Sequence, residues 1–431
     1  MINCFMLGDK FFQKPKKFSS LNFIIDELEK NREQIYFYPL DVIVEIINQY
    51  SQILLKNREL LNYEGVSYLA LWMKKSNINK LLSIDIENRD YLDDFVKIEN
   101  NKFMKAQPRG VICHFMAGNV PTLSIYYAIQ ALLCKNLNLI RVPIQNIAIV
   151  AELLKPLQHI TVNFNGKEYS GIVLLKSISL VNFPSDNIEL NREMSQVADV
   201  RVICGGEEAV NSLTILPKKT TCKDIIFGPK YSFAVFEKSA IDSSNLSKTL
   251  DFFARDIVTF HQKACSSPQV LFVEKSDMDI KLLAKALSES LMKLSKIYPN
   301  DQISQCASAK IINKRGEYLL SLDKDIICDT GLQYTILMNN DINLEEPIHY
   351  RTIFIKEVDD IFQICNLITP RIQTIGIASE NQSKFREFAN KVSLKGVDRI
   401  VKVGCMNIYD SPWDGIFFMR EIVKWTTLTL D

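Results

Sequence analysis

Hydrophobic and polar positions follow two different patterns along the chain, and the change comes near residue 108. Up to about residue 105 the sequence is rich in charge and mostly helical in pattern. Beyond residue 108, short β-branched runs alternate with helical patterns. Residues 111–114, 123–133 and 138–142 predict a strand, a helix and a second strand, which is the signature of a parallel β-α-β unit.

The same alternation continues to the end of the chain and predicts an α/β fold. Apolar residues recur at a spacing of three and four between Leu250 and Ala264, which predicts a long helix with one apolar face. The final stretch, Lys424–Leu430, alternates in the manner of an edge strand. Further strands are expected at residues 171–175, 200–204, 224–227, 232–236, 270–273, 334–338, 352–355, 374–377 and 400–403.

One stretch, residues 110–134, carries no formal charge and is long enough to cross a bilayer. It begins with a β-branched patch, and Gly118-Asn119-Val120-Pro121 interrupts it. We therefore interpret it as a buried strand, a loop and a buried helix, and we expect no membrane span.

Length and charge narrow the classes of function. The 431 residues leave room for two domains. Lys and Arg number 51 against 50 Asp and Glu, so the formal net charge is +1. The chain therefore lacks the excess positive charge that is typical of proteins that bind nucleic acid or an anionic membrane. With 47% hydrophobic and 23% charged residues, a disordered or fibrous protein is excluded. No two of the four histidines lie at metal-ligand spacing, so we expect no metal site.

The ten cysteines contain no C-x-x-C pair, which argues against a zinc ribbon or a thioredoxin-like redox motif. Scattered thiols in a chain of this length indicate a reducing compartment, with most of them serving as small core residues. The first residues lack an apolar segment behind a basic start, so we expect no signal peptide and a cytoplasmic protein.

The usual signatures of nucleotide binding and of serine hydrolysis do not occur. The chain has no G-x-G-x-x-G, no G-x-x-x-x-G-K-[ST] and no G-x-S-x-G. A nucleotide site in this protein must therefore use another loop.

Three segments together resemble the aldehyde dehydrogenase superfamily, and within it most closely the acyl-CoA reductases of the LuxC type. They are PRGVICHFMAGNVP at 108–121 with KNLNLIRVP at 135–143, DIIFGPK at 224–230, and ARDIVTFHQKACSSPQ at 254–269. The likeness runs from about residue 105 to the end. It implies a Rossmann-like cofactor domain and an α/β catalytic domain. We expect an N-terminal helical region and the dinucleotide-binding domain in 1–261, the catalytic domain in 262–395, and an oligomerisation segment, or a return to the first domain, in 396–431.

The resemblance implies that Cys265 is the acyl-accepting nucleophile. A thiolate attacks a thioester carbonyl well, and a cysteine between a helix and a strand can face a cleft. Attack creates an oxyanion that needs a fixed donor, and the resemblance gives this role to the side chain of Asn119. The alternatives are a buried structural cysteine and an asparagine that serves the turn beside Gly118.

For the cofactor, the resemblance points to Gly205 and Gly206 after a strand, and to Gly228 in the third segment. Glycines allow close backbone approach, and a helix N-terminus favours a diphosphate. Arg141 stands where the superfamily has a lysine near the ribose, and an arginine suits the 2′-phosphate of NADPH, with NADH as the alternative. Ordinary turns and a surface strand end are the competing interpretations, and Glu207 and Glu208 count against a simple anion site.

One departure from the superfamily pattern is informative. Hydrolytic members carry a glutamate before Gly-Gly-Lys to activate water, and this chain has Ile226 there. Releasing a free acid needs such a base, whereas reducing an acyl thioester to an aldehyde does not. The absence of the base therefore favours acyl reduction over aldehyde oxidation.

His114 and His261 lie near the candidate residues in sequence, and we interpret both as satisfied core or cleft histidines. Trp413 and Asp414 occupy the place of a late superfamily loop, where lining a pocket and packing the loop are equally open. Glu345 and Glu346 lack the surrounding motif of the superfamily's ribose-binding glutamate, so no role is assigned to them.

The predicted function is therefore NADPH-dependent reduction of an acyl thioester, with a fatty acyl group from CoA or a protein, through an acyl group on Cys265. The resemblance implies an acyl-activating or acyl-transferring partner protein, and we expect a homo-oligomer. A small or sugar-linked acyl group is an alternative substrate. The rival functions are an acyltransferase that uses the same thiol without hydride transfer, and a non-catalytic subunit of an acyl-transfer complex.

Overall fold

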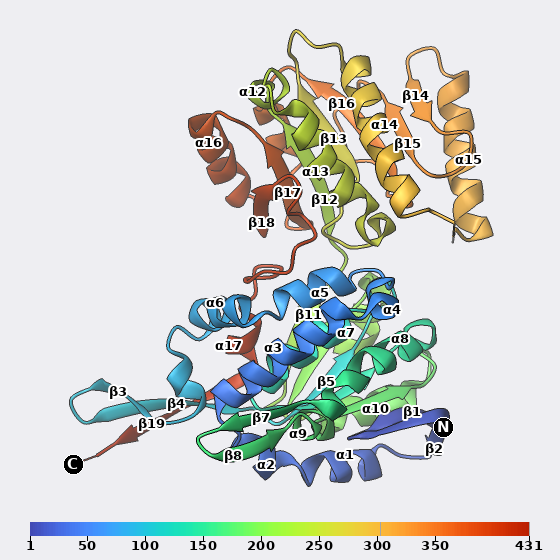
Figure 1. Cartoon of the computed structure of the whole chain (residues 1–431). Helices are drawn as coiled ribbons and strands as arrows, with labels where there is room; N and C mark the ends of the chain where they lie inside the picture. Colours follow the sequence, from blue (N-terminus) through green and yellow to red (C-terminus); the bar gives the residue numbers. More distant parts are fainter. Residues whose placement is uncertain (302, 431) are drawn as a thin grey trace. The chain divides into compact units, whose positions relative to one another are not determined.

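The computed structural model describes residues 1–301 and 303–430, which form two compact units (Figure 1). Unit 1 comprises Met1–Gly228 and the chain from Tyr409 onward, and unit 2 comprises Pro229–Ile408. The first boundary lies at residue 228 rather than at 261, because the strand and helix before residue 261 pair and pack with the second sheet. The second lies at residue 408, because the last strand pairs within unit 1.

Unit 1 is built on a sheet with the strand order β11-β10-β5-β6-β9-β1-β2. Pairing is parallel from β11 to β9 and antiparallel at β1 and β2. Every residue of β5 is buried, as expected of a parallel strand that is covered on both faces. The strands are β1 (Ile2–Leu7), β2 (Lys10–Phe18), β5 (Val111–Phe115), β6 (Leu137–Arg141), β9 (Ile178–Asn182), β10 (Val200–Cys204) and β11 (Lys223–Phe227).

The helices of unit 1 pack their apolar residues into one core with this sheet. α7 is buried on nearly every side, which explains why its sequence is apolar all round. The principal helices are α1 (Asn22–Glu29), α3 (Leu40–Lys56), α5 (Val66–Trp72), α6 (Lys75–Asp85), α7 (Leu123–Leu133), α8 (Ile144–Leu154), α10 (Ile188–Val197) and α11 (Glu207–Thr214).

The uncharged stretch 110–134 is the strand β5, a loop and the helix α7, as the sequence predicted. Among the described residues, no helix combines the length and the hydropathy that crossing a bilayer requires.

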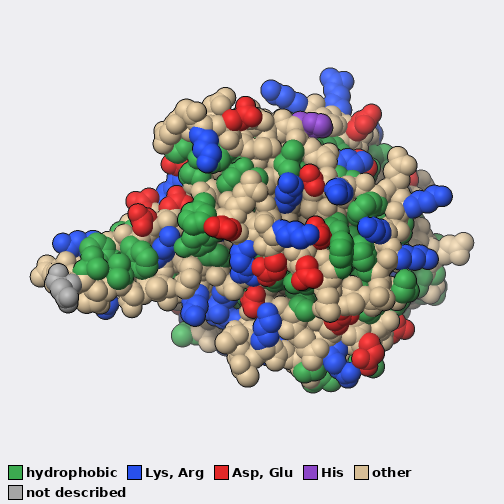
Figure 2. Space-filling view, turned by 90° about the horizontal axis from the view of Figure 1, so that it is seen from below, with side chains coloured by type: hydrophobic (Ala, Val, Ile, Leu, Met, Phe, Trp, Pro, Cys, Tyr) green, Lys and Arg blue, Asp and Glu red, His purple; other side chains and the backbone are tan. Residues whose placement is uncertain are grey.

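A second, three-stranded sheet of unit 1 has the order β19-β4-β3. It joins β3 (Val96–Glu99) and β4 (Lys102–Pro108) to β19 (Val423–Thr429), and the hairpin projects from the body of the unit (Figure 1). β19 confirms the strand predicted at the end of the chain. Figure 2 shows Lys and Arg interspersed with Asp and Glu over the face that it presents, in keeping with the near-zero net charge.

Unit 2 contains a sheet with the order β14-β15-β16-β13-β12-β17-β18, parallel throughout except at β14. Apolar clusters lie on both of its faces, against α13 (Leu246–Val258), α14 (Ile280–Ile297), α15 (Gln305–Leu320) and α16 (Gln382–Ser393). The strands and the leading helix are β12 (Tyr231–Phe236), α13 (Leu246–Val258), β13 (Val270–Glu274), β14 (Asp325–Cys328), β15 (Thr335–Met338), β16 (Thr352–Val358), β17 (Ile372–Ala378) and β18 (Arg399–Lys402).

Three local predictions were wrong. The apolar run 171–175 is the short helix α9 (Ile172–Lys176), and the strand β9 begins only at Ile178. Residues 2–18, in the region expected to be mostly helical, form β1 and β2. The helix predicted to run to Ala264 ends at Val258, where the backbone turns into left-handed conformations.

Candidate active site

The predicted cofactor residues gather along one edge of the unit 1 sheet. The register pairs Phe115 with Arg141 and Cys204 with Phe227, so the carboxyl ends of β5, β6, β10 and β11 meet there. From β5 the chain continues to β6 on one side of that strand, whereas β10 and β11 lie on its other side. In open α/β sheets, ligands bind at the carboxyl ends beside such a reversal of strand order. The loops 116–122 and 205–206 flank this position.

Asn119 is half-buried in the loop 116–122, between β5 and α7. The start of the loop is held by the Met116 N–H, which donates to the Arg141 carbonyl at 3.2 Å, and by Asn146 Nδ2, which donates to the Gly118 carbonyl at 3.0 Å. At its other end, Thr122 Oγ1 shares a hydrogen bond of 2.7 Å with the Tyr409 hydroxyl. The loop is therefore fixed on both sides of Asn119.

Arg141 ends β6 at this edge, half-buried rather than on an open surface. Its guanidinium carbon lies 5.1 Å from the centroid of the Phe183 ring, within the range of a cation–π contact. Nε also donates to the Phe183 carbonyl at 3.4 Å. Burial lowers the pKa of the guanidinium from its ordinary value, but an arginine keeps its charge.

Gly206 and Gly228 leave space at the edge, whereas a Cβ added to Gly205 would lie 3.1 Å from the Ala209 Cβ. Gly205 is fixed by its N–H, which donates to the Phe227 carbonyl at 3.1 Å, and Gly206 is the N-cap of α11. A Cβ added to Gly206 or Gly228 would meet no atom within 4 Å, so nothing in the protein itself requires a glycine there. This open space fits a dinucleotide that approaches the backbone closely. Glu207 and Glu208, exposed in the first turn of α11, repel a diphosphate.

Cys265 lies in unit 2, in the loop that joins α13 to the amino end of β13. It is half-buried, and its carbonyl accepts a hydrogen bond of 2.6 Å from Ser232 Oγ at the start of β12. The same serine oxygen accepts the Thr374 N–H at 3.1 Å, which connects the loop to β17. The backbone of the cysteine is thus fixed to the sheet.

Two buried glutamines brace the loop from either end. Gln262 Nε2 donates to the carbonyls of Pro268 at 2.9 Å and Thr352 at 3.1 Å. Gln269 Nε2 donates to the carbonyls of Gln262 at 3.0 Å and Ser267 at 3.2 Å. Since buried carbonyls are costly to leave unpaired, these contacts favour one conformation of the loop.

The backbone before Cys265 is strained. Phe260, His261 and Gln262 have φ of 56°, 47° and 60°, which side-chain-bearing residues rarely adopt. A second left-handed turn, His349–Arg351, packs against it: the Tyr350 N–H donates to the His261 carbonyl at 2.7 Å, and His349 Nδ1 donates to the Gln262 carbonyl at 2.8 Å. Strain of this kind persists where the surroundings over-determine it, and it concentrates at functional sites.

Asn407 is a further brace that the sequence did not single out. It is buried, and its Oδ1 accepts hydrogen bonds from Ser266 Oγ at 2.7 Å and Ser267 Oγ at 3.2 Å, the two residues after Cys265. Its Nδ2 donates to the Asp256 carbonyl at 2.9 Å. Because Asn407 lies 142 positions beyond Cys265, no local pattern could reveal the contact.

Most other cysteines are buried, and Cys306 and Cys328 are exposed. Burial raises the pKa of Cys4 to about 12, which makes it an inert core thiol. Cys204 and Cys405 are half-buried as Cys265 is, so exposure alone does not identify the nucleophile.

The histidines lie in the core or in a cleft, but the interpretation of His114 as fully satisfied is wrong, because its buried Nδ1 has no hydrogen-bond partner among the described residues. His114 is fully buried with Nε2 2.9 Å from Asn138 Oδ1, and burial lowers its pKa to about 4. Burial also lowers the pKa of His261 to about 4. Neither is poised to act as a base near neutral pH. No three His, Cys, Asp or Glu side chains in 1–301 and 303–430 are grouped so as to hold a metal ion.

Two further candidates, Trp413 and Glu345, make contacts within the protein. Trp413 is buried beside Tyr126 and Tyr409 in unit 1, with ring centroids 6.2 and 6.0 Å away, which supports loop packing. Glu345 pairs at 2.8 Å with the fully buried Lys356. Ile226, in the place of the hydrolytic glutamate, is partly exposed near the end of β11.

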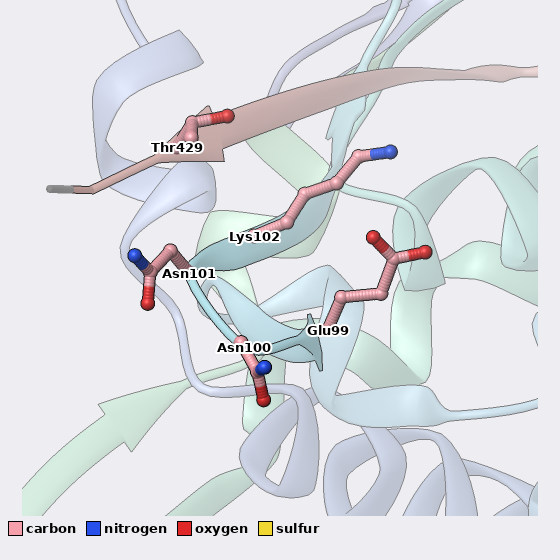
Figure 3. A pocket seen from close by; sticks show the side chains of 5 residues that line it. All are labelled: Glu99, Asn100, Asn101, Lys102 and Thr429. Atoms are coloured by element: carbon pink, nitrogen blue, oxygen red, sulfur yellow. The ribbon is translucent and has the colours of Figure 1, made fainter.

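Two hollows lie away from the predicted site residues. One of about 600 Å³ is formed at the β3–β4 turn by Glu99–Lys102 and Thr429 (Figure 3). The other, of about 760 Å³, lies in unit 2 between α13, α16 and residues 402–405. None of the predicted catalytic or cofactor residues lines either hollow.

Solved structures with the same architecture identify the fold. Aldehyde dehydrogenase 21 from Physcomitrella patens, in complex with succinate, matches with a TM-score of 0.68 at 10% identity, covering 99% of this chain and 98% of that one. The glyceraldehyde-3-phosphate dehydrogenase GapN from Methanocaldococcus jannaschii, complexed with NADP, matches at 0.66 and 13%, covering 99% and 98%. The fold is that of the aldehyde dehydrogenases.

The chain belongs to the acyl-CoA reductase (LuxC) family, whose model matches residues 39–425. It is 27% identical to the long-chain acyl-protein thioester reductase of Photorhabdus laumondii, over 85% of this chain and 76% of that protein. It is 26% identical to the Aliivibrio fischeri protein of the same name, over 82% and 72%. Membership of this family makes the chain an oxidoreductase and confirms the resemblance seen in the sequence.

Proposed function

We propose that this protein reduces an acyl thioester to the aldehyde with NADPH, through a thioester on Cys265. The observation that carries the proposal is the loop of Cys265: a half-buried thiol whose flanking backbone is fixed by buried amides and hydroxyls on both sides. Such fixation suits a nucleophile that must meet a carbonyl in one geometry. The family match extends over this loop.

The proposed reaction divides into two transfers. The Cys265 thiolate attacks the carbonyl carbon of the donor, and the resulting oxyanion accepts a hydrogen bond from Asn119 Nδ2. The new C–S bond is kept, the oxyanion collapses, and the donor thiolate leaves. NADPH, when bound, supplies the hydride. Adding that hydride and a proton leaves a thiohemiacetal on Cys265, and breaking its C–S bond releases the aldehyde and restores the thiolate.

Two features support reduction over hydrolysis and NADPH over NADH. Ile226 offers no base to activate water, so a Cys265 thioester would persist until the hydride arrives. Arg141 places a permanent positive charge at the carboxyl end of β6, where it suits a 2′-phosphate. Gly205, Gly206 and Gly228 are proposed to lie against the cofactor.

The relatives named as long-chain acyl-protein thioester reductases suggest the donor, so we propose a long-chain acyl group carried on a protein or on CoA. An acyl-activating or acyl-transferring protein would then supply it. We further propose that the protein is cytoplasmic. We also propose a homo-oligomer, because β19 pairs with β4 on one side and can accept a strand on the other. A monomer mass by light scattering at micromolar concentration would contradict that assembly.

The test is intact mass after incubation with a series of acyl-CoAs, without NADPH, for the wild type and Cys265→Ala. We expect one acyl adduct on the wild type only, and its discharge by NADPH with release of the aldehyde. The length of the acyl chain that reacts fastest identifies the substrate.

An acyltransferase is the second candidate, and the carboxylates of Glu207 and Glu208 at the start of α11 favour it because they oppose a dinucleotide. It predicts an adduct that persists with NADPH and moves to another acceptor. No adduct from acyl-CoA or from an acylated carrier protein would contradict both candidates and indicate a non-catalytic subunit.

A further inference from the structure

One short segment of the chain carries a buried anchor for each of the two loops assigned to the chemistry. In unit 2, Asn407 accepts hydrogen bonds from the two serines that follow Cys265. In unit 1, the Tyr409 hydroxyl shares its hydrogen bond with Thr122, three residues after Asn119. Only Ile408 separates the two anchors in the chain.

The Asn407 anchor is rigid because its own backbone is held. The Asp256 carboxylate accepts the N–H groups of Gly404 at 2.5 Å and Met406 at 3.2 Å, which fixes the chain just before Asn407. Asn407 has 2% of its surface exposed, and all of its amide contacts are internal to unit 2. Moving Asn407 would therefore displace the carboxyl side of the Cys265 loop.

The Tyr409 anchor is rigid because aromatic rings surround it. Its ring stacks on Tyr126 with centroids 4.6 Å apart and an angle of 18°, and Trp72 lies edge-on at 6.3 Å. The hydroxyl of Tyr126 donates to the Asp410 carbonyl at 3.0 Å, so the chain after Tyr409 is tied to α7 as well. Thr122 is fully buried at the start of α7, so its hydroxyl is not exposed to solvent.

We propose that Asn407 and Tyr409 are positioning residues for acyl transfer: Asn407 sets the loop of the nucleophile, and Tyr409 sets the loop of the oxyanion donor. The inference rests on the proposed function, because it assigns Cys265 and Asn119 the roles given there. Neither anchor touches a reacting atom. A misplacement of about 1 Å in a reacting group costs on the order of 100-fold in rate, so loosening either anchor should be visible.

The experiment compares two reactions of the same thiol. Acylation of Cys265 by the fastest acyl donor requires the oxyanion donor and the loop geometry. Alkylation by iodoacetamide displaces iodide directly and requires only an accessible thiolate. Peptide mass mapping follows both at Cys265, and the exposed Cys328 serves as the internal reference for alkylation.

We expect Asn407→Ala to slow acylation at saturating donor about 100-fold, and Tyr409→Phe, which removes one hydroxyl, about tenfold. Alkylation of Cys265 should change less than about threefold in both, which separates positioning from loss of the thiol's reactivity. Matched controls are Asn339→Ala, a buried asparagine of unit 2 that contacts Tyr318, and Tyr50→Phe, a buried tyrosine of unit 1 that donates to Leu153. Both controls should acylate as the wild type does.

If Asn407→Ala fails to fold, Ser266→Ala with Ser267→Ala removes the same hydrogen bonds from the other side and should slow acylation similarly. In a folded Asn407→Ala protein, adding Ser266→Ala should cost nothing more, because the contact is already lost. Additive losses would overturn the Asn407 assignment.

Wild-type acylation rates in the anchor variants would overturn this inference and leave the proposed function standing. Equal losses of acylation and alkylation would also overturn it, since they indicate damage to the thiol's surroundings. A wild type that no donor acylates would overturn the proposed function, and the inference with it.

Discussion

The two loops assigned to the chemistry lie at opposite ends of their sheets. In unit 1, the loop 116–122 follows the carboxyl end of β5, beside open space at Gly206 and Gly228. In unit 2, the loop of Cys265 precedes the amino end of β13, and buried amides from Gln262 and Gln269 cross it. One edge is left open and the other is closed by the protein itself.

The proposed function accounts for this difference. A cofactor edge must admit a large group, so the protein places glycines and few side chains there. A nucleophile needs a fixed direction of attack, so its loop is over-determined by buried hydrogen bonds and strained backbone. Under the proposed roles, the same α/β layering serves one site that needs open space and one that needs a fixed loop.

The largest effect should come from the oxyanion donor. Asn119→Ala removes the proposed hydrogen bond to the developing charge, and we expect acylation of Cys265 to slow about 100- to 1,000-fold. The variant should still fold, since the backbone anchors of the loop remain. Quenched-flow mass measurements report the rate. Asn62→Ala, at an exposed asparagine of unit 1, is the control, and wild-type acylation in Asn119→Ala would remove this residue from the chemistry.

The next effect tests the closed loop of unit 2. Gln269→Leu keeps the volume but removes the donors to the Gln262 and Ser267 carbonyls. We expect acylation to slow about 100-fold and the free energy of unfolding to fall by about 1–3 kcal/mol. Gln158→Leu removes a donor to the Asp9 carbonyl in unit 1 and should affect stability alone. Equal catalytic losses in both variants would contradict a special role for the loop.

A pH titration distinguishes the buried ionisable groups of the two units. Burial raises the pKa of Asp256 in unit 2 to about 7 despite two backbone donors. Between pH 4 and 7 the folded protein therefore keeps a proton on Asp256 that the unfolded chain has lost. As the pH rises through this range, the free energy of unfolding relative to that of Asp256→Asn should fall by up to about 1.4 kcal/mol per pH unit. His114 in unit 1, whose pKa is lowered to about 4, has the opposite sign and adds stability as pH rises to about 6.5. Denaturant unfolding at several pH values measures both slopes, and parallel curves for wild type and Asp256→Asn would contradict the first.

The smallest effect concerns the open edge. Arg141→Gln removes the positive charge at the end of β6, and we expect the KM for NADPH to rise about tenfold and the KM for NADH to change less than twofold. Steady-state kinetics with both cofactors checks this. Equal shifts would mean that Arg141 does not distinguish a 2′-phosphate.

The parallel sheets were predictable because their strands are short, β-branched and separated by periodic helices. Val200–Cys204 and Leu123–Leu133 agree with the sequence to the residue. The apolar run at 171–175 misled because a short buried helix and a buried strand share one pattern. The hairpin at residues 2–18 was missed because its polar, lysine-rich second strand lacks alternation.

The candidate site was predictable only where a motif is local. The loop of Cys265 carries its own signature, and the glycine loops follow strands. Asn407 and Tyr409 form their contacts with residues more than a hundred positions away. The left-handed turn before Cys265 contains no glycine from which the turn could be predicted. Long-range packing and over-determined backbone leave no periodic trace in a single sequence.

The hairpin of β1 and β2 has a consequence for solubility. β1 pairs with β9, and β2, which ends the sheet, contains Pro15 and lysines that discourage further pairing. A chain that lacked residues 1–18 would present the uncharged β9, Ile178–Asn182, as a bare template for another chain. The first eighteen residues therefore cover a strand edge that would otherwise be open to pairing, although they lie outside residues 39–425, which match the family model.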